Sequence, residues 1–192
     1  PFAELPEAVK EYVVAGEREQ LNTGFKCRTR NPWYVVPSVW VPDAFMLRQV
    51  HSYPKIIVNH ASTTCTDTIH RIRLRNGVKA EVIAASFLNS LTFAFSEVTG
   101  RSYGGGVLEL EPNEAERLPL PLKGAEQLDL KLIHELLLKD DIDSVLALTD
   151  KALLVEGLGL KISEVKTLRG MWRKLRDRRI NRKHTSKRAV TT

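Results

Sequence analysis

Hydrophobic residues recur at helical spacing, among Glu and Lys, in the first part of the chain: Leu5, Val9, Val13 and Leu21. This spacing predicts a helix over residues 3–21. Between residues 23 and 75 the pattern changes to short β-branched and aromatic runs separated by Pro, Asn and Ser, which is typical of strands and turns. The predicted strands cover residues 33–36, 39–41, 45–47, 55–58 and 68–74. Because these runs follow one another closely, we expect an antiparallel meander.

A long apolar segment follows the turn at Asn76-Gly77. Residues 78–98 contain no Pro or Gly and are apolar on most sides, and a helix of that kind is buried. We expect the strands to pack on this single helix. After it, the glycines at 104–106 lead to a predicted strand over 107–110, and Asn113 is expected to cap a short helix.

Three further apolar stripes at helical spacing predict helices over residues 126–138, 141–155 and 162–180. The last stripe is narrow, and the other faces of that helix are basic. The expected domains are an N-terminal helix (1–22), a target-recognition body (23–121) and a helical arm with a basic tail (122–192). The expected fold class is α+β, with a small antiparallel strand-rich body packed on a buried helix and followed by the helical C-terminal arm.

Composition narrows the class of protein. The chain has 192 residues, of which 43% are hydrophobic and 27% charged. One globular domain, or one domain with an appendage, is therefore expected, and a disordered or collagen-like chain is excluded. No apolar run approaches the roughly 18–20 residues of a membrane span. We therefore expect no membrane partner and a cytoplasmic protein whose two cysteines stay reduced.

The positive charge is concentrated in two segments. Residues 161–192 contain 12 basic and 2 acidic side chains, a net of +10, whereas the whole chain carries +6. Residues 23–75 contain 8 basic side chains against 2 acidic ones. Two basic segments on an otherwise acidic chain favour a polyanionic partner, most simply nucleic acid.

Several segments together carry a family resemblance: Arg30-Asn31-Pro32-Trp33-Tyr34-Val35-Val36, Ser90-Leu91-Thr92-Phe93, Gly100-Arg101-Ser102-Tyr103-Gly104-Gly105-Gly106-Val107-Leu108-Glu109-Leu110-Glu111-Pro112 and Leu118-Pro119-Leu120-Pro121. The chain resembles the C-terminal target-recognition region of bacterial adenine-specific DNA methyltransferases of restriction–modification systems, the gamma-type, TaqI-like group. The resemblance covers residues 26–121, about half of the chain, and its most specific part is the Gly-Gly-Gly strand with the Pro-bounded helix.

The chain departs from that family in its catalytic motifs. Such enzymes carry an Asn-Pro-Pro-Tyr or Asn-Pro-Pro-Phe tetrapeptide that holds the extruded adenine, and a glycine loop that binds S-adenosylmethionine. Here Trp33 replaces the second Pro, and no strand, glycine turn and helix precede it. We therefore expect this chain alone to be inactive, with no catalytic residue and no cofactor. The resemblance implies S-adenosylmethionine for a catalytic half elsewhere in the same parent chain.

The candidate DNA-binding residues are basic, aromatic or hydroxyl side chains of the two basic segments and the glycine-rich loop: Arg28, Arg30, Tyr34, Arg71, Arg73, Arg75, Arg101, Ser102, Tyr103, Arg173, Lys174, Arg178 and Arg182. Arginine pairs with phosphate and guanine in a bidentate manner, and aromatic rings stack on bases. Arg71, Arg73 and Arg75 alternate, which would place them on one face of a strand.

Structural explanations stay open for each group. The alternating arginines suit a solvated face equally well, Trp33 and Tyr34 suit a strand core, and the glycines suit a loop that needs positive φ angles. The basic tail can be a solvated helix face.

Asp140, Asp141 and Asp143 lie at the start of a predicted helix, where N-capping and the helix dipole explain them. His51, His60, His70 and Cys65 match no zinc spacing, so no metal is expected.

These observations favour a DNA-binding target-recognition module of a site-specific adenine DNA methyltransferase. The expected partners are double-stranded DNA and the catalytic methyltransferase half. The parent enzyme would transfer a methyl group from S-adenosylmethionine to adenine in duplex DNA. The alternative is a non-catalytic DNA-specificity or assembly subunit of a restriction–modification complex, in which the C-terminal helices bind a partner protein.

Overall fold

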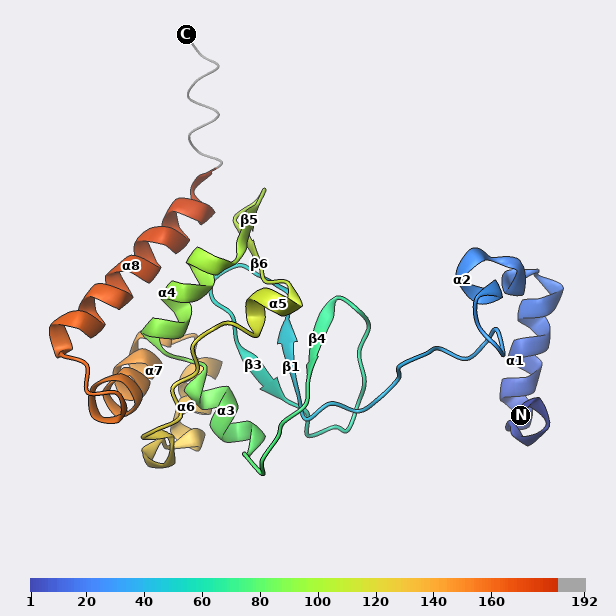
Figure 1. The fold of residues 1–192 in the computed structure, drawn as a ribbon, viewed down its shortest axis with the longest axis horizontal. Coiled ribbons are helices and arrows are strands. Elements are labelled where there is room, and N and C mark those ends of the chain that lie inside the picture. The colour runs from blue at the N-terminus through green and yellow to red at the C-terminus, as the bar shows by residue number, and fades with distance from the viewer. Residues whose placement is uncertain (183–192) are drawn as a thin grey trace, which may run out of the picture. The chain divides into compact units, whose positions relative to one another are not determined.

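A computed structural model describes residues 1–182 of the chain. Contacts within the chain divide it into two compact units, a first unit of Pro1–Trp40 and a second unit that begins at Val41 (Figure 1). The fold class is α+β, as the sequence predicted, with small antiparallel sheets and a helical C-terminal region.

The first unit is a short helical body. Its elements are two 3₁₀ turns, η1 (Phe2–Glu4) and η2 (Leu21–Thr23), and two helices, α1 (Glu7–Arg18) and α2 (Phe25–Arg28). The indole N–H of Trp33 donates a hydrogen bond of 3.0 Å to the Glu17 carboxylate. A Cβ atom at Gly16 would lie 2.8 Å from the Trp33 ring, so a glycine is needed for Trp33 to lie this close to α1.

Two of the predicted strands and one long helix are absent from the first unit. The helix predicted over residues 3–21 is limited to α1, because Pro6 precedes it and the backbone turns after Arg18. Residues 33–36 form a turn and 39–41 an extended segment without a ladder partner. Proline at 32 and 37 removes N–H groups that a ladder needs. Trp33 packs against α1, but it does not lie in a strand.

The second unit holds two three-stranded antiparallel sheets. Their strands are β1 (Ala44–Leu47), β2 (Gln49–Val50), β3 (Ile56–Val58), β4 (Ile69–Ile72), β5 (Arg101–Tyr103) and β6 (Val107–Glu109). The orders are β3-β1-β4 and β2-β6-β5. The predicted single meander is therefore wrong, because β1 lies between β3 and β4, which follow each other in the chain without pairing. In addition, β2 pairs with β6 in the second sheet, through Val50 and Leu108.

The apolar segment 78–98 forms two helices, α3 (Ala80–Ser86) and α4 (Ser90–Thr99), and not the single helix that was predicted. Asn89 separates them. Its buried side-chain oxygen accepts the N–H of Thr92 at 2.9 Å, and its amide donates to the Ser86 carbonyl at 2.7 Å. An N-cap inside the apolar run starts a new helix that is bent by 76° from the first.

Within the described chain, no single helix is both long and apolar enough to cross a membrane; α3 and α4 reach the required length and composition only when taken together as a bent pair.

The remaining helices follow in the order α5 (Pro112–Ala115), η3 (Ala125–Gln127), α6 (Leu130–Leu138), α7 (Ile142–Thr149), the π-helix η4 (Asp150–Gly157) and α8 (Ile162–Ile180). The prediction for α8 is confirmed. Asn113 is not the cap of α5, because Glu111 occupies that position and donates its N–H to Glu114 at 2.8 Å. Asp129 and Asp141 cap α6 and α7, so α6 begins later than predicted.

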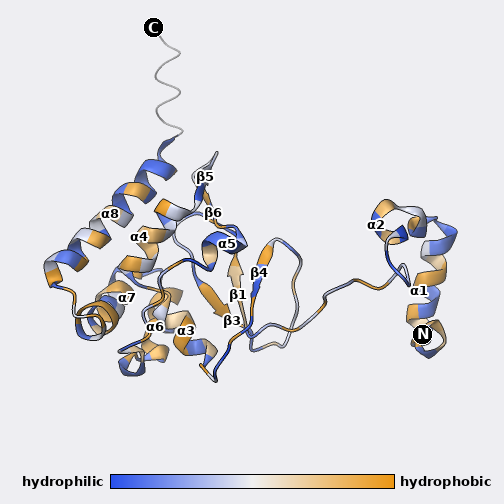
Figure 2. Ribbon diagram, in the orientation of Figure 1, coloured by the Kyte–Doolittle hydropathy of each residue, from blue (hydrophilic) through white to orange (hydrophobic). Residues whose placement is uncertain are grey.

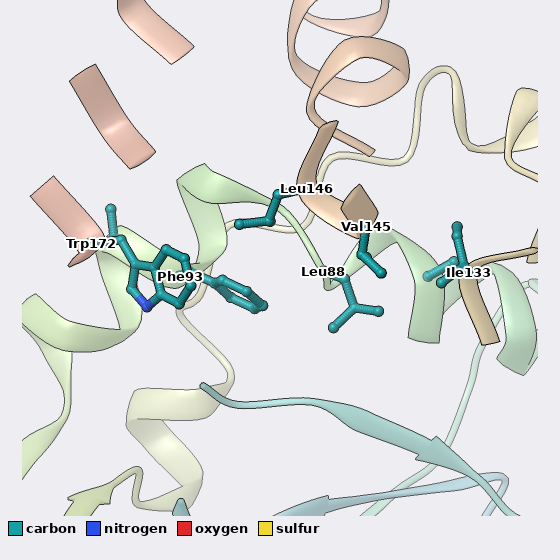
Figure 3. Close-up of a cluster of buried hydrophobic side chains, with 8 residues drawn as sticks. Leu88, Phe93, Ile133, Val145, Leu146 and Trp172 are labelled. Carbon is teal, nitrogen blue, oxygen red and sulfur yellow. The ribbon is translucent and has the colours of Figure 1, made fainter. Parts of the chain in front are cut away.

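The main core joins α4, α6, α7 and α8 (Figure 3). The Phe93 ring of α4 lies 5.0 Å from the Trp172 ring of α8, and Tyr53 stacks on Phe93 at 5.3 Å. Trp172 and Phe93 are completely buried, and burial of two such rings contributes several kcal/mol at about 25 cal/mol per Å². The narrow apolar stripe of α8 therefore completes this core by packing against α4.

Two buried ion pairs flank this aromatic contact. Arg179 of α8 binds both carboxylate oxygens of Glu97 in α4, at 2.6 and 2.9 Å, and both side chains are only 3% exposed. Arg169 donates to Asp150 at 2.7 Å, and Asp150 in turn accepts the N–H and hydroxyl of Ser90, the first residue of α4. Charged groups thus fix α8 on α4 at both ends of the contact.

Arg179→Ala is expected to destabilise the second unit by about 3–5 kcal/mol, because it leaves the Glu97 carboxylate buried without a partner. Arg173 lies on the same helix as Arg179, but it forms an exposed ion pair with Asp143 of α7. Arg173→Ala is therefore expected to change the stability by less than about 1 kcal/mol. Urea unfolding followed by circular dichroism measures both values. Equal losses for the two variants would contradict a structural role for the buried pair.

Candidate nucleic-acid interface

Apart from Lys166, the cations of α8, together with Arg182 just beyond its end, fall into two sets. One set is paired with carboxylates inside the second unit: Arg169 with Asp150, Arg173 with Asp143, Arg176 with Asp177 and Arg179 with Glu97. Arg176 also lies over the Trp172 ring, with its guanidinium carbon 4.7 Å from the ring centroid. These arginines hold the helix in place, so part of the basic charge predicted beside the apolar stripe of α8 is paired within the fold.

The other set forms an exposed row. Lys174 and Arg178 of α8 and Arg182, two residues beyond its end, are spaced four residues apart. The first two therefore follow one face of the helix, about 6 Å apart along its axis, and Arg182 continues their spacing. Within residues 1–182, no carboxylate lies within ion-pair distance of them. Like charges at this spacing repel one another. Figure 2 shows that the C-terminal half of α8 is strongly hydrophilic. We call these three residues the α8 row.

The β5–β6 hairpin is fixed against the end of α8. Arg179 donates hydrogen bonds to the carbonyls of Gly106, in the hairpin turn, and of His51, the latter at 2.8 Å. Gly106 has a φ of +76°, and a Cβ there would lie 2.9 Å from the Cα of Ile180. Glycine is required at this position both for the left-handed backbone and for the close approach to α8.

A groove of about 400 Å³ lies between the hairpin and α8. Its lining residues are Glu97, Ser102, Leu108, Leu175, Arg178, Arg179 and Arg182. Three sequence-predicted residues, Ser102, Arg178 and Arg182, are therefore brought together although some 75 residues separate them in the chain. Leu108 and Leu175 contribute apolar walls, so the groove presents cations and a hydroxyl group beside an apolar surface.

Arg101 and Tyr103 lie on the other face of the hairpin. In the register of β5 and β6, Arg101 is opposite Glu109 and Ser102 is opposite Leu108, so the two faces differ in polarity. Arg101 donates from Nε to Glu114 at 2.9 Å, and this hydrogen bond is the main reason that its pKa is raised. The Tyr103 side chain is 47% exposed. Arg101 is thus partly engaged within the fold.

Beneath Arg101, the hairpin is anchored by charged side chains. Arg48 donates to Glu109 at 2.8 Å and to Glu111 at 2.7 Å, and Gln49 donates to Glu109 at 2.5 Å. The hydrogen bonds from Gln49 and Arg48 lower the pKa of the Glu109 carboxyl. These interactions hold β6 on the segment that carries β2 and therefore help to set the position of the hairpin.

Arg71, Arg73 and Arg75 do not share a strand face, contrary to the prediction. β4 ends at Ile72, so Arg73 and Arg75 lie in the segment that leads to the Asn76-Gly77 turn. The Asp43 carboxylate accepts the N–H of Leu74 at 2.7 Å, which turns the backbone away from the ladder. Arg71 is half-buried opposite Phe45, whereas Arg73 and Arg75 are exposed.

The predicted residues of the first unit surround a second hollow. Arg28 and Arg30 do not alternate along a strand, because α2 and a turn carry them. A hollow of about 410 Å³ is lined by Lys26, Thr29, Arg30, Asn31, Pro32, Val35 and Pro37. Arg28 is exposed outside this lining. Tyr34 packs edge-on against Trp33 and Phe2, at 5.9 and 6.3 Å between ring centroids, so its ring belongs to the packing of this unit.

Sequence reasoning missed three residues that shape these surfaces. Lys26 lines the hollow, and only its place in a basic run could have indicated it. Glu97 and Glu114 hold arginines that lie 82 and 13 residues away, and a single sequence contains no signal for such pairs. Lys183, Lys187 and Arg188 of the predicted basic tail lie outside the described residues.

The residues present do not fit an S-adenosylmethionine site of the usual kind. Such a site needs a parallel strand that leads through a glycine turn into a helix. In residues 1–182 every strand pair is antiparallel, and the Gly104–Gly106 turn joins β5 to β6 within a hairpin.

The acidic residues that begin α7 act in capping and pairing. The Asp141 side chain accepts the N–H of Ser144 at 3.1 Å. Hydrogen bonds from the Ser144 side chain and then from its backbone N–H lower the pKa of Asp141. Asp143 pairs with Arg173. Across the described part of the chain, no group of three or more His, Cys, Asp or Glu side chains is placed to hold a metal ion.

Comparison with known proteins gives one family. Residues 1–154 match the family model described as Type II methyltransferase M.Eco57I, C-terminal domain. The match spans the first unit, both sheets and the helices through most of η4, and it ends before α8. Neither a curated protein nor a solved structure matches the chain.

The hairpin anchor is expected to weaken in acid. The folded-state pKa of Glu109 is lowered, so its contribution to stability is complete above the unfolded-state pKa near 4.5 and is lost as the pH falls below that value. Glu109→Gln should therefore flatten the pH dependence of stability below pH 4.5. Thermal melts from pH 3 to pH 7 measure this effect, and an unchanged pH profile in the variant would contradict it.

Proposed function

The chain belongs to the family of the C-terminal domain of Type II methyltransferase M.Eco57I, and from this premise we propose that it is the DNA-binding target-recognition module of a site-specific adenine DNA methyltransferase. The parent enzyme would use S-adenosylmethionine, bound by its catalytic half, to methylate adenine in double-stranded DNA. This module would hold the duplex while the target base is extruded.

The α8 row is the observation that carries the proposal. Four arginines of the same helix are paired with carboxylates, while Lys174, Arg178 and Arg182 are spaced along one exposed face without such a partner among the described residues. Repulsion within the row is relieved when a polyanion binds. Phosphates of a DNA strand supply negative charge at regular intervals, which suits a row of cations better than a single small anion does.

The groove beside the row supports a division of roles. Phosphate contacts position a duplex, whereas contacts with base edges provide sequence preference. The α8 row is suited to phosphate contact. The β5–β6 hairpin, which Arg179 holds beside it, presents Ser102 and Tyr103 at an exposed edge strand. A two-stranded ribbon of this kind is narrow enough to enter the major groove, about 12 Å wide.

Arg178→Ala is expected to lower the slope of log affinity against log salt by about 0.9, because one phosphate contact is lost. The triple variant at Lys174, Arg178 and Arg182 should lower the slope by about 2.7 for the same reason. Fluorescence anisotropy with a labelled 20-base-pair duplex at several salt concentrations gives these slopes.

Arg173→Ala is the matched control, because it removes one exposed charge from a different face of α8, where Asp143 already pairs with it, and it should leave the slope unchanged. If the triple variant binds DNA like the wild type, the row does not contact the duplex. The alternative would then gain support, namely a non-catalytic specificity or assembly subunit whose C-terminal helices contact a partner protein.

A further inference from the structure

The hollow of the first unit combines features of an anion site. Lys26 and Arg30 line it together with the polar residues Thr29 and Asn31, and its lining contains no carboxylate. Residues 23–40 carry three cations, Lys26, Arg28 and Arg30, and no acidic side chain. Within the described residues none of these cations is within ion-pair distance of a carboxylate.

Charge is segregated within this small unit. Its five acidic side chains all lie in residues 1–22, along α1 and its flanks, where Lys10 pairs with Glu7. The basic segment is nevertheless fixed on α1, because Glu17 accepts the Trp33 indole hydrogen bond and Gly16 allows the ring to approach. The acidic residues therefore help to order the basic segment without neutralising its three cations.

The chemistry of the hollow suits a phosphodiester. Lysine acts as a point charge and arginine as a planar donor of two parallel hydrogen bonds, and together they neutralise and orient one phosphate group. A concave lining suits a phosphate group of the backbone, which can enter it. Residues that contact base edges must instead project from the protein into a groove of the duplex.

We propose that the hollow lined by Lys26 and Arg30 is a second DNA-backbone site, so that the chain grips one duplex through two separate units. This inference rests on the proposed function of the α8 row. The two units are separate compact bodies joined near Trp40. Binding of the second unit therefore raises the effective concentration of DNA at the first, and a sufficiently long duplex gains affinity from both.

The test compares two labelled duplexes of mixed sequence, one of 10 and one of 30 base pairs, binding to the complete chain. Lys26→Ala/Arg30→Ala is expected to bind the 30-base-pair duplex at least about tenfold more weakly than the wild type. Its salt slope on that duplex should fall by about 1.8, from two lost cations. Affinity for the 10-base-pair duplex, which offers one helical turn of backbone, about the length that a single binding module covers, should change by less than about twofold.

Lys10→Ala/Arg18→Ala is the matched control, since it removes two charges from α1 of the same unit and should leave both affinities unchanged. Circular dichroism checks that each variant keeps its helical content. The α8 triple variant should weaken binding to both duplexes, so the two sites are separated by their dependence on duplex length.

Three outcomes would overturn the inference. If the Lys26/Arg30 variant binds both duplexes like the wild type, the hollow does not hold DNA. If it weakens both equally, its cations belong to the same site as the α8 row. If the wild-type chain binds neither duplex, the proposed function itself fails and the inference fails with it; the first two outcomes leave that function intact.

Discussion

The buried contact of Arg179 with Glu97 is the interaction on which the second unit depends. One guanidinium joins α8 to α4 through the carboxylate and joins α8 to the β5–β6 hairpin through the Gly106 carbonyl. A charge this deeply buried is tolerated only when its hydrogen bonds are satisfied, so the partners must keep their relative positions. The hairpin, the groove and the α8 row are consequently parts of one rigid arrangement.

The helix α8 carries two kinds of cation side by side. Some are arginines that hold this arrangement together, and the others remain exposed. A dense basic sequence could be read as a uniform binding surface, but carboxylates of α4, α7, η4 and α8 itself occupy four of its arginines. The remaining row is smaller and better defined. The suitability of α8 for contact with a regular polyanion therefore depends on which of its cations lack a carboxylate partner, and not on its total charge.

The two units bring different chemistry to one chain. The first unit orders a short basic segment on an acidic helix through one tryptophan, and the second unit presents a cationic row beside a hairpin. The family match spans the first unit and the sheets but ends before α8. The part of the chain that carries the clearest cationic row thus lies outside the region that defines the family.

The sequence by itself determined the α+β class, α8, the strands at 45–47, 56–58 and 107–109, and the family, because periodicity, turn residues and motifs are local properties. Tertiary structure decided the rest. Asn89 splits an apolar run because its capping partners are within reach, Trp33 packs on Gly16 rather than in a strand, and β2 joins a sheet formed 58 residues later. Partners far apart in sequence, such as Glu97 and Arg179, are selected by packing, so no local pattern could separate structural cations from available ones.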